Sequence, residues 1–354
     1  MDLREVGNLF MVGFYGERFS AEVETLLADL NPCGVILFSR NIKDPVQLAQ
    51  LTHELQRFSR EHGSDGLFIG VDQEGGRVRR LRDPFSEFPP ARTIALSPDA
   101  EQSAREFARV TARELRLVGF NLDFVPVLDV LAHPEALEQS VIGDRSYGSD
   151  PALVSRLGRV VLETFRAEGV IPCCKHFPGH GGTRVDSHKE LPTDTRPAEV
   201  IEQNDLVPFL DAVEAGTEMI MTAHVLYSSL DSDYPATLSR AVIGGLLRRR
   251  MGYDGVVVTD DLDMGAVANW YATDECALMA IHAGADIPLI CNKPEKAFAA
   301  AARIVDAIKD RDLSESRVAE SLRRIRTLKG KYAATMNPCD VAAVHRRFGL
   351  NEVV

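Results

Sequence analysis

The chain has 354 residues, of which 45% are hydrophobic and 26% are charged, and its formal net charge is −12. This composition is that of a globular protein with a large core, and it argues against an intrinsically disordered chain. The acidic balance argues against a nucleic-acid partner, which needs clustered Lys and Arg, and against docking on anionic lipid.

Cysteine spacing and the N-terminal segment indicate in which cellular compartment the protein is located. The six cysteines include no C-x-x-C pair and no Cys/His spacing typical of a zinc site. The segment MDLREVGNLF carries acidic residues and lacks the apolar core of a signal peptide. No apolar stretch reaches the ~18 residues of a membrane span. Free thiols and the missing export signal predict a cytoplasmic protein without a membrane anchor.

Short apolar runs recur along the chain, and they are continuous rather than alternating, which is typical of strands buried on both faces. The runs are Leu9–Phe14, Val35–Phe38, Leu67–Val71, Leu122–Leu128, Val170–Cys174, Met219–Thr222, Val256–Thr259 and Ile287–Ile290. Helical segments separate them, and several begin with a proline, which suits the first helical turn. These segments are Ala21–Leu30, Pro45–Glu61, Ala100–Val118, Pro151–Glu168, Pro197–Ala215, Ser239–Met251, Thr273–Ala283 and Glu295–Lys309.

Strict alternation of eight strands with helices predicts an α/β fold in which a parallel sheet closes as a single (β/α)8 barrel of the TIM type. The rival is a doubly wound open sheet, which usually has a Gly-rich turn after an early strand. Gly75–Gly76 is only a pair, and no G-x-G-x-x-G follows any run. We expect residues 1–335 to form the catalytic barrel, ending in an amphipathic helix at Ser316–Lys331, and residues 336–354 to form a tail that packs on or near it.

Ionisable side chains directly follow five of the predicted strands. They are Asp72 with Glu74, Asp129, Lys175 with His176, His224, and Asp260 with Asp261. The carboxyl ends of barrel strands share one face, and catalytic groups gather there. We therefore expect these side chains to lie around one site.

The densest polar segment is KHFPGHGGTRVDSH, from Lys175 to His188. A metal site is one interpretation, but Pro178 and the glycines around it exclude the helix that His176 and His180 would need to share an ion. We therefore expect neither a metal nor a cofactor. A second interpretation is that these histidines only hold the loop together.

Asp186 and His188 suit that second interpretation less well. They are two residues apart in an extended loop, so a carboxylate can orient an imidazole that exchanges a proton near neutral pH. A serine partner would need a G-x-S-x-G turn, which the chain lacks. Asp260 offers a carboxylate instead. A carboxylate nucleophile with a proton donor is the layout of a retaining glycosidase, and His188 would replace the usual second carboxylic acid.

Eight motifs between residues 34 and 264 stand in the order of a known family. They are GVILFSRN, VDQEGGRVRRL, NLDFVPVLDV, VIGDRSYG, KHFPGHGGTRVDSH, MTAHVLY, PATLS and GVVVTDDLDM. With them the chain resembles glycoside hydrolase family three, and within it the compact bacterial β-N-acetylglucosaminidases (β-hexosaminidases) of cell-wall recycling. The D-S-H ending of the long motif separates that group from the family's glucosidases and xylosidases. LAHPEALEQS, residues 131–140, departs from the family's Asn-rich turn.

The resemblance implies a retaining exo-enzyme that removes non-reducing terminal N-acetylglucosamine from peptidoglycan fragments, the N-acetylglucosamine-anhydro-muramyl peptides. In it Asp260 matches the nucleophile, His188 the acid/base and Asp186 its partner. The matching sugar-binding positions are Asp72, Arg80, Arg145, Lys175 and His176. The chain ends soon after the barrel, as in the compact cytoplasmic type, and we expect a monomer without a nucleic-acid or membrane partner.

Three alternative functions stay open, as does one residue assignment. The same fold could transfer the sugar to phosphate, because a neutral histidine repels phosphate less than a carboxylate does. It could be another β-glycosidase of the family, or a non-catalytic sugar-binding module. The acid/base role could also belong to Glu74 or His224 instead of His188.

Overall fold

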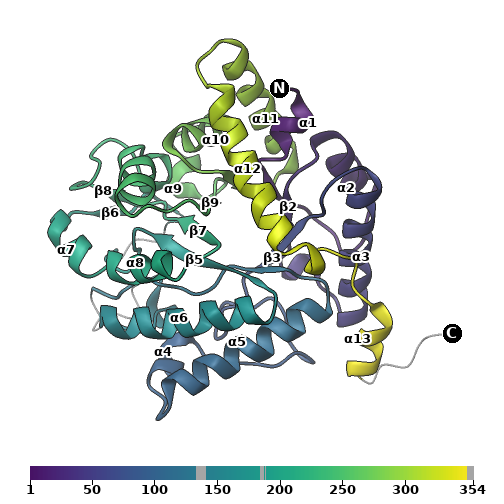
Figure 1. Ribbon diagram of the computed structural model, residues 1–354, viewed down its shortest axis with the longest axis horizontal. Coiled ribbons are helices and arrows are strands. Elements are labelled where there is room, and N and C mark those ends of the chain that lie inside the picture. Colours follow the sequence, from purple (N-terminus) through teal and green to yellow (C-terminus); the bar gives the residue numbers. More distant parts are fainter. Residues whose placement is uncertain (133–140, 184–186, 188, 349–354) are drawn as a thin grey trace.

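The computed structural model describes residues 1–132, 141–183, 187 and 189–348, and its parallel strands close into a barrel (Figure 1). The strands, in their order around the barrel, are β1 (Met11–Gly13), β2 (Gly34–Ile36), β3 (Phe68–Val71), β4 (Leu122–Asp123), β5 (Ile171–Phe177), β7 (Met219–Thr222), β9 (Val256–Asp261) and β10 (Ile287–Ile290). β10 pairs with β1 and completes the closure. The predicted (β/α)8 fold is confirmed, and the open doubly wound sheet is excluded.

The fourth strand is shorter than the apolar run Leu122–Leu128 predicted. β4 ends at Asp123, where the hydrogen bonds to β5 become irregular: the Ile171 N–H donates to the Asn121 carbonyl, but the Cys173 N–H donates to the Val125 carbonyl. The chain still runs beside β5, where the Leu128 N–H donates to the Lys175 carbonyl at 2.7 Å. This keeps the end of the run, and Asp129 after it, next to the start of the long polar loop.

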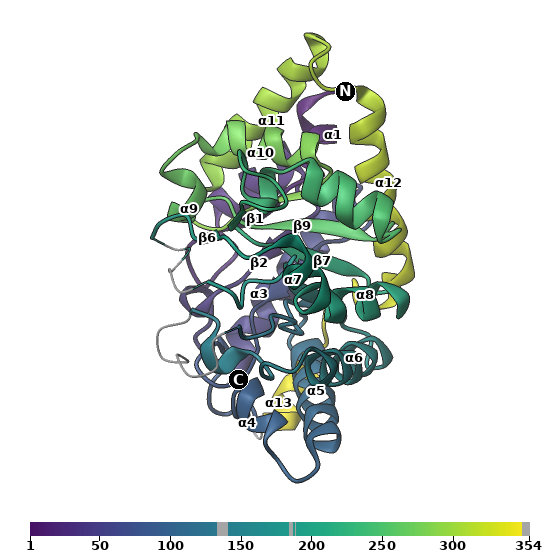
Figure 2. The same cartoon turned by 90° about the vertical axis from the view of Figure 1, so that its left-hand side faces the viewer.

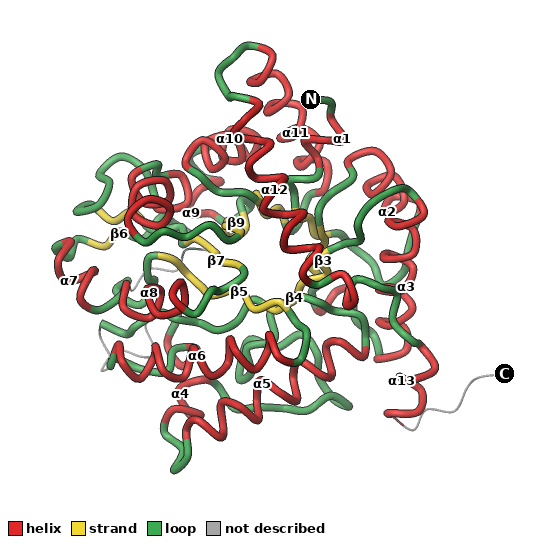
Figure 3. Tube along the Cα trace, viewed as in Figure 1, coloured by secondary structure: helices red, strands yellow, loops and turns green. Residues whose placement is uncertain are grey.

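Helices surround the barrel on its outside (Figure 3). They are α1 (Leu3–Gly7), α2 (Ala21–Thr25), α3 (Pro45–Glu61), α4 (Ala91–Ala95), α5 (Ala100–Leu117), α6 (Pro151–Ala167), α7 (Ala198–Gln203), α8 (Leu206–Glu214), α9 (Gly265–Ala268), α10 (Thr273–Ala283), α11 (Pro294–Lys309), α12 (Glu315–Lys331) and α13 (Val341–Phe348). Leu26–Leu30 and Ala241–Arg250 are π-helical segments. Side chains of Asp44, Asp99 and Asp150 cap the first turns of α3, α5 and α6.

One predicted helix is wrong in its extent. The segment Pro197–Ala215 forms two helices, α7 and α8, which are separated at Asn204 and Asp205. The Asp205 side chain is fully buried and accepts two hydrogen bonds from Arg196. The helical periodicity of the sequence could not predict this ion pair, so it indicated one continuous helix.

Helix α12 lies across the end of the barrel where the strands begin. The Lys329 ammonium donates to the Gly66 carbonyl ahead of β3 at 2.6 Å, and Arg324 pairs with Asp286 ahead of β10 at 3.2 Å. In Figure 2 α12 lies on the opposite side of the molecule from α9 and the short strand β6 (Thr193–Asp194). The end where the strands finish is thus left for the long loops.

The last described segment, residues 336–348, lies on the outside of the barrel. Met336 and Val344 are fully buried, and the Cys339 thiol donates to the Ala49 carbonyl in α3 at 3.2 Å. Helix α13 lies beside α3 (Figure 1). Among the helices that the structure describes, none is both long enough and apolar enough to cross a membrane.

Candidate active site

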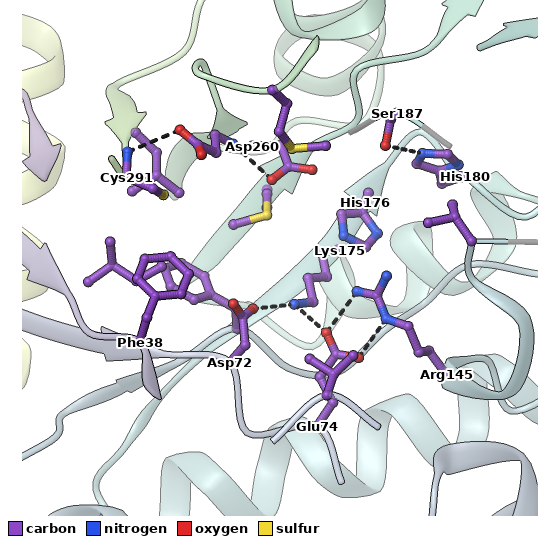
Figure 4. A pocket seen from close by; sticks show the side chains of 18 of the residues that line it. Phe38, Asp72, Glu74, Arg145, Lys175, His176, His180, Ser187, Asp260 and Cys291 are labelled. Atoms are coloured by element: carbon purple, nitrogen blue, oxygen red, sulfur yellow. Dashed lines mark hydrogen bonds and ion pairs between the residues drawn. The ribbon is translucent and has the colours of Figure 1, made fainter. Parts of the chain in front are cut away.

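A cavity of about 300 Å³ opens where the barrel strands end (Figure 4). Its volume lies at the lower limit of the usual range for small-molecule sites. Its lining includes the predicted nucleophile and all five predicted sugar-binding residues. These residues are Asp72, Arg80, Arg145, Lys175, His176 and Asp260. The structure therefore brings together side chains that are up to 188 positions apart in the sequence, from 72 to 260.

A network of ion pairs forms one wall of this cavity. The buried Lys175 ammonium lies 2.8 Å from an Asp72 oxygen and 2.6 Å from a Glu74 oxygen. Arg145 binds Glu74 through two parallel hydrogen bonds of 2.7 and 2.8 Å, and Arg80 lies 3.3 Å from Asp72. Each charge has an opposite partner, so the wall offers fixed donors and acceptors without an unpaired buried charge.

Glu74 also lines the cavity, as its place after a strand end led us to expect, although it was not among the five predicted sugar-binding residues. Burial by itself raises its pKa, but Arg145 and Lys175 outweigh burial and hold the pKa well below its usual range. A carboxyl group that stays ionised cannot donate a proton near neutral pH. The alternative that Glu74 is the catalytic acid is therefore disfavoured.

Asp129 supports the cavity from behind and is fully buried. One of its oxygens lies 2.7 Å from Nδ1 of His176, and the other accepts the backbone N–H groups of His176 and His180 at 3.1 and 2.7 Å. The carboxylate therefore orients the His176 ring and fixes the first turn of the long polar loop. Nε2 is the ring nitrogen that His176 offers to a ligand.

Asp260 and Asp261 end β9 side by side but differ in what they contact. Asp261 accepts the backbone N–H of Asp263 and of Cys291, each at 3.0 Å, and burial raises its pKa to about 6. Burial also acts to raise the pKa of Asp260, but the charges of His224 and His176 and the Asp261 N–H outweigh it, so its pKa lies below the ordinary value. Asp260 therefore presents the more acidic, ionised carboxylate to the cavity (Figure 4).

His224 does not line the cavity, although it also follows a strand end. It is fully buried, with its ring nitrogens 2.9 Å from the Thr237 hydroxyl and 3.0 Å from the Asp261 carbonyl. His224 thus holds the backbone beside the two aspartates, which disfavours it as the group that reaches a leaving oxygen.

Asp186 and His188, the predicted acid/base pair, lie outside the described residues. Ser187 between them is buried and lines the cavity, and its hydroxyl lies 3.2 Å from Nε2 of His180. Nδ1 of His180 lies 2.8 Å from the Thr183 hydroxyl. Burial, together with His176, lowers the pKa of His180 to about 4, so this ring is neutral near pH 7. His180 is a residue that holds the loop together.

A second charged cluster supports the same loop from outside, and sequence reasoning did not find it. Arg196 lies 2.6 Å from Asp194 and 2.8 Å from Asp205, and both carboxylates are buried. Asp194 belongs to β6, which pairs in parallel with β8 (Leu226–Tyr227). A Cβ atom on Gly182 would lie 2.2 Å from the Arg196 guanidinium, so only glycine lets the loop approach so closely.

Among the described residues, no group of three or more His, Cys, Asp or Glu side chains is arranged to hold a metal ion.

Residues 3–328 match the family model described as the N-terminal domain of glycosyl hydrolase family 3. The chain belongs to this family. The family resemblance predicted from the motifs is thus confirmed, as is the prediction that the protein is a glycoside hydrolase. A protein named β-hexosaminidase from Thiobacillus denitrificans is 44% identical to this family 3 hydrolase over 292 residues, which cover 81% of this chain and 79% of the relative.

Solved structures of the family share the fold of this hydrolase. A family 3 β-N-acetylglucosaminidase from Paenibacillus sp. superposes with a TM-score of 0.91 at 37% identity, covering 98% of this chain and 68% of that one. NagZ from Neisseria gonorrhoeae, in complex with N-trifluoroacetyl-D-glucosamine, has a TM-score of 0.74 at 31% identity, covering 92% of this chain and 98% of that one.

Proposed function

We propose that this family 3 hydrolase is a retaining exo-β-N-acetylglucosaminidase that removes non-reducing terminal N-acetylglucosamine from peptidoglycan fragments. Asp260 acts as the nucleophile, and His188, assisted by Asp186, acts as the acid and base. The observation that carries the proposal is the ionised Asp260 carboxylate, which faces the same cavity as the network of Asp72, Lys175 and Arg145. Relatives named β-hexosaminidase support the choice of sugar.

The reaction has two steps. In the first, an Asp260 oxygen attacks the anomeric carbon, and the bond to the leaving oxygen breaks as His188 gives that oxygen a proton. In the second, His188 takes a proton from water, the water oxygen attacks the anomeric carbon, and the bond to Asp260 breaks. Glu74 cannot easily replace His188, because Arg145 and Lys175 keep it ionised.

The cavity supports cleavage at a chain end. Its volume of about 300 Å³ suits a small ligand, and Glu74 and Arg145 of the ion-pair network lie on the side of the pocket opposite Asp260 (Figure 4). The paired oxygens and nitrogens of Asp72, Lys175 and Arg80 are suited to binding hydroxyl groups of the terminal ring. All six cysteines are free thiols, which fits the proposed cytoplasmic location.

Trapping the covalent intermediate tests the proposal. A slow fluorinated N-acetylglucosaminide should add one sugar mass, and peptide mapping should find that sugar on Asp260. Asp260→Ala should lose several orders of magnitude in turnover while staying folded. A label on Asp261 would show that the nucleophile is the next residue and would refute the assignment to Asp260. Sugar release that requires phosphate would identify a phosphorylase instead of a hydrolase.

A further inference from the structure

The segment that follows the nucleophile strand holds both described neighbours of His188 in the sequence. The Ser187 carbonyl accepts the backbone N–H of Ala266 at 3.1 Å. The Lys189 carbonyl accepts the side-chain amide of Asn269 at 2.9 Å. Ala266 lies in α9, and Asn269 is the residue that ends this helix. Two segments 80 positions apart in the sequence are therefore joined on both sides of the proposed acid and base.

Helix α9 has a fixed place relative to Asp260. It begins shortly after β9 ends, and the Met264 N–H donates to the Asp261 carbonyl at 3.0 Å. Ala266 and Val267 are buried, and Val267 packs in the main core, so the helix cannot shift without disturbing close packing. The Ala266 N–H belongs to the first helical turn, where it has no acceptor within the helix, and it is therefore available to the loop.

The loop also has a support on the barrel side. The Ser187 hydroxyl lies 3.2 Å from Nε2 of His180, and the backbone N–H of His180 donates to Asp129 at 2.7 Å. Figure 4 shows Ser187 and His180 in the same pocket as Asp260. These bonds connect the loop to its own beginning after β5. The bonds from α9 connect it to the strand that carries the nucleophile.

The distance between that strand and the loop matters for the chemistry. In a retaining glycosidase the nucleophile and the acid/base act on the same bond, and in the two-carboxylate enzymes they are roughly 5 Å apart. A displacement of about 1 Å in such an arrangement can cost on the order of a hundredfold in rate. A contact that sets the distance from α9 to the loop therefore affects proton transfer without touching the sugar.

We propose that Asn269 is a positioning residue for the acid and base. Through the Lys189 carbonyl it holds the loop at the distance from Asp260 that proton transfer to and from the leaving oxygen requires. Asn269 is exposed and does not line the cavity, so it acts through the loop and not on the sugar. The inference rests on the proposed function, because it takes His188 as the acid and base.

The test compares Asn269→Ala with the wild type on two substrates that differ in their need for an acid. They are chitobiose, whose leaving group is a sugar, and a dinitrophenyl N-acetyl-β-glucosaminide, whose leaving group needs little acid. For chitobiose kcat/KM should fall about fivefold, the effect of losing one hydrogen bond to the loop. For the aryl substrate kcat/KM should stay within about twofold, while kcat, limited by the second step and its base, should fall about fivefold.

Three matched variants identify the hydrogen bond as the cause. Asn269→Gln keeps the amide and should recover most of the loss, whereas Asn269→Asp keeps the shape without an N–H and should behave like Asn269→Ala. Asn337→Ala breaks an exposed bond of the same kind, from the Asn337 amide to the Ala334 carbonyl at 3.3 Å, and should change neither substrate. Asn269→Ala and Asn337→Ala should have similar melting temperatures.

A double-mutant cycle with His188→Ala separates positioning from a structural role. Without the imidazole there is nothing to position, so adding Asn269→Ala to His188→Ala should change kcat for the aryl substrate by less than about twofold. A fall of the same size in both backgrounds would overturn the inference, as would an unchanged kcat when His188 is present. If His188→Ala by itself keeps the wild-type kcat, the proposed role of His188 fails, and the inference fails with it.

Discussion

Asp260 and Asp261 are neighbours in the chain, yet their surroundings separate the two carboxylates. Burial raises the pKa of Asp261 to about 6, although its carboxylate accepts the backbone N–H groups of Asp263 and Cys291. For Asp260 the charges of His224 and His176 outweigh burial, and its pKa is lowered. The same principle disfavours Glu74 as the acid, because a carboxyl group that arginine and lysine keep ionised is a poor proton donor. Environment, not residue type, therefore assigns the roles of carboxylates in this site.

We predict that His188→Ala will separate substrates by their leaving groups. An aryl glycoside with a good leaving group needs little acid, so its first step should survive, while glycosides with sugar leaving groups should lose most of their turnover. The second step should slow for both, which should appear as a burst of nitrophenolate in stopped-flow traces. Added azide, which needs no base, should restore turnover and give a glycosyl azide.

Asp186→Asn should reduce activity less than His188→Ala, because it removes only the orientation and charge support of the imidazole. Equal losses on aryl and natural substrates, without rescue by azide, would contradict an acid/base role for His188.

Among Arg79, Arg80 and Arg82, which lie close together in the sequence, only Arg80 should matter for catalysis. Arg80 lines the cavity beside Asp72, whereas Arg79 pairs with the half-exposed Glu87 and Arg82 is exposed. Arg80→Ala should lower kcat/KM by tens- to thousands-fold, because a charged hydrogen bond to the sugar is lost and Asp72 keeps one cation fewer. Arg82→Ala and Arg79→Ala are the matched controls. If they lose as much activity as Arg80→Ala, the positive charge of the segment matters and not a specific contact of Arg80.

At the scale of elements, the long loop after β5 is held from two sides. Asp129 binds the backbone N–H groups of His176 and His180 from the barrel side, and Arg196 with its two buried carboxylates lies against Gly182 on the other. One guanidinium cannot fully compensate two buried carboxylates. Burial raises the pKa of Asp205 to about 6, and Asp194 adds to the rise against the hydrogen bonds from Arg196.

This cluster predicts how stability depends on pH. Between its ordinary pKa of 3.8 and about 6, the folded chain binds a proton on Asp205 that the unfolded chain does not, so the contribution of this group to stability grows as pH falls. Asp205→Asn removes that titration. In urea unfolding, the free energy of unfolding of the wild type relative to that of the variant should increase by roughly 1–3 kcal/mol from pH 7 to pH 4. Parallel stability curves for the two proteins would contradict the raised pKa.

For the whole molecule, the two ends of the barrel divide stability from catalysis. The site lies where the strands finish, and α12 crosses the end where they begin. There the buried Glu218 pairs with Arg166 at 2.8 Å, with the Tyr332 hydroxyl at 3.0 Å and with Lys331. These contacts stabilise the folded barrel without touching the active site, because the chemistry of such barrels takes place at the other end.

Glu218→Gln should therefore lower the free energy of unfolding by about 2 kcal/mol, because three partners lose a buried charge. It should leave kcat/KM unchanged at temperatures well below the melting temperature. Glu202→Gln, which breaks the exposed pair with Arg250, is the control and should change stability by less than about 1 kcal/mol. A loss of activity in Glu218→Gln without unfolding would show that the two ends are coupled.

The eight barrel strands, their closure and the family could all be predicted from patterns along the chain. Continuous apolar runs and the residues that follow them are local properties, and a (β/α)8 barrel brings all strand ends to one face whatever their spacing in the chain. This is why Asp72, Lys175 and Asp260 could be predicted to share a site, and they do. Asp186 and His188 lie outside the described residues, so their roles remain predictions from the motif.

The contacts of each strand-end residue depend on the three-dimensional fold. In the folded chain Asp129 and His224 lie behind the cavity, and Glu74 pairs with Arg145, which is 71 positions away in the sequence. The predicted helix is interrupted at Asp205, and α13 packs against α3. These outcomes depend on ion pairs and hydrogen bonds between segments that are distant in the chain. Their partners are set by the arrangement of strands around the barrel, and no periodicity within a single segment reports that arrangement.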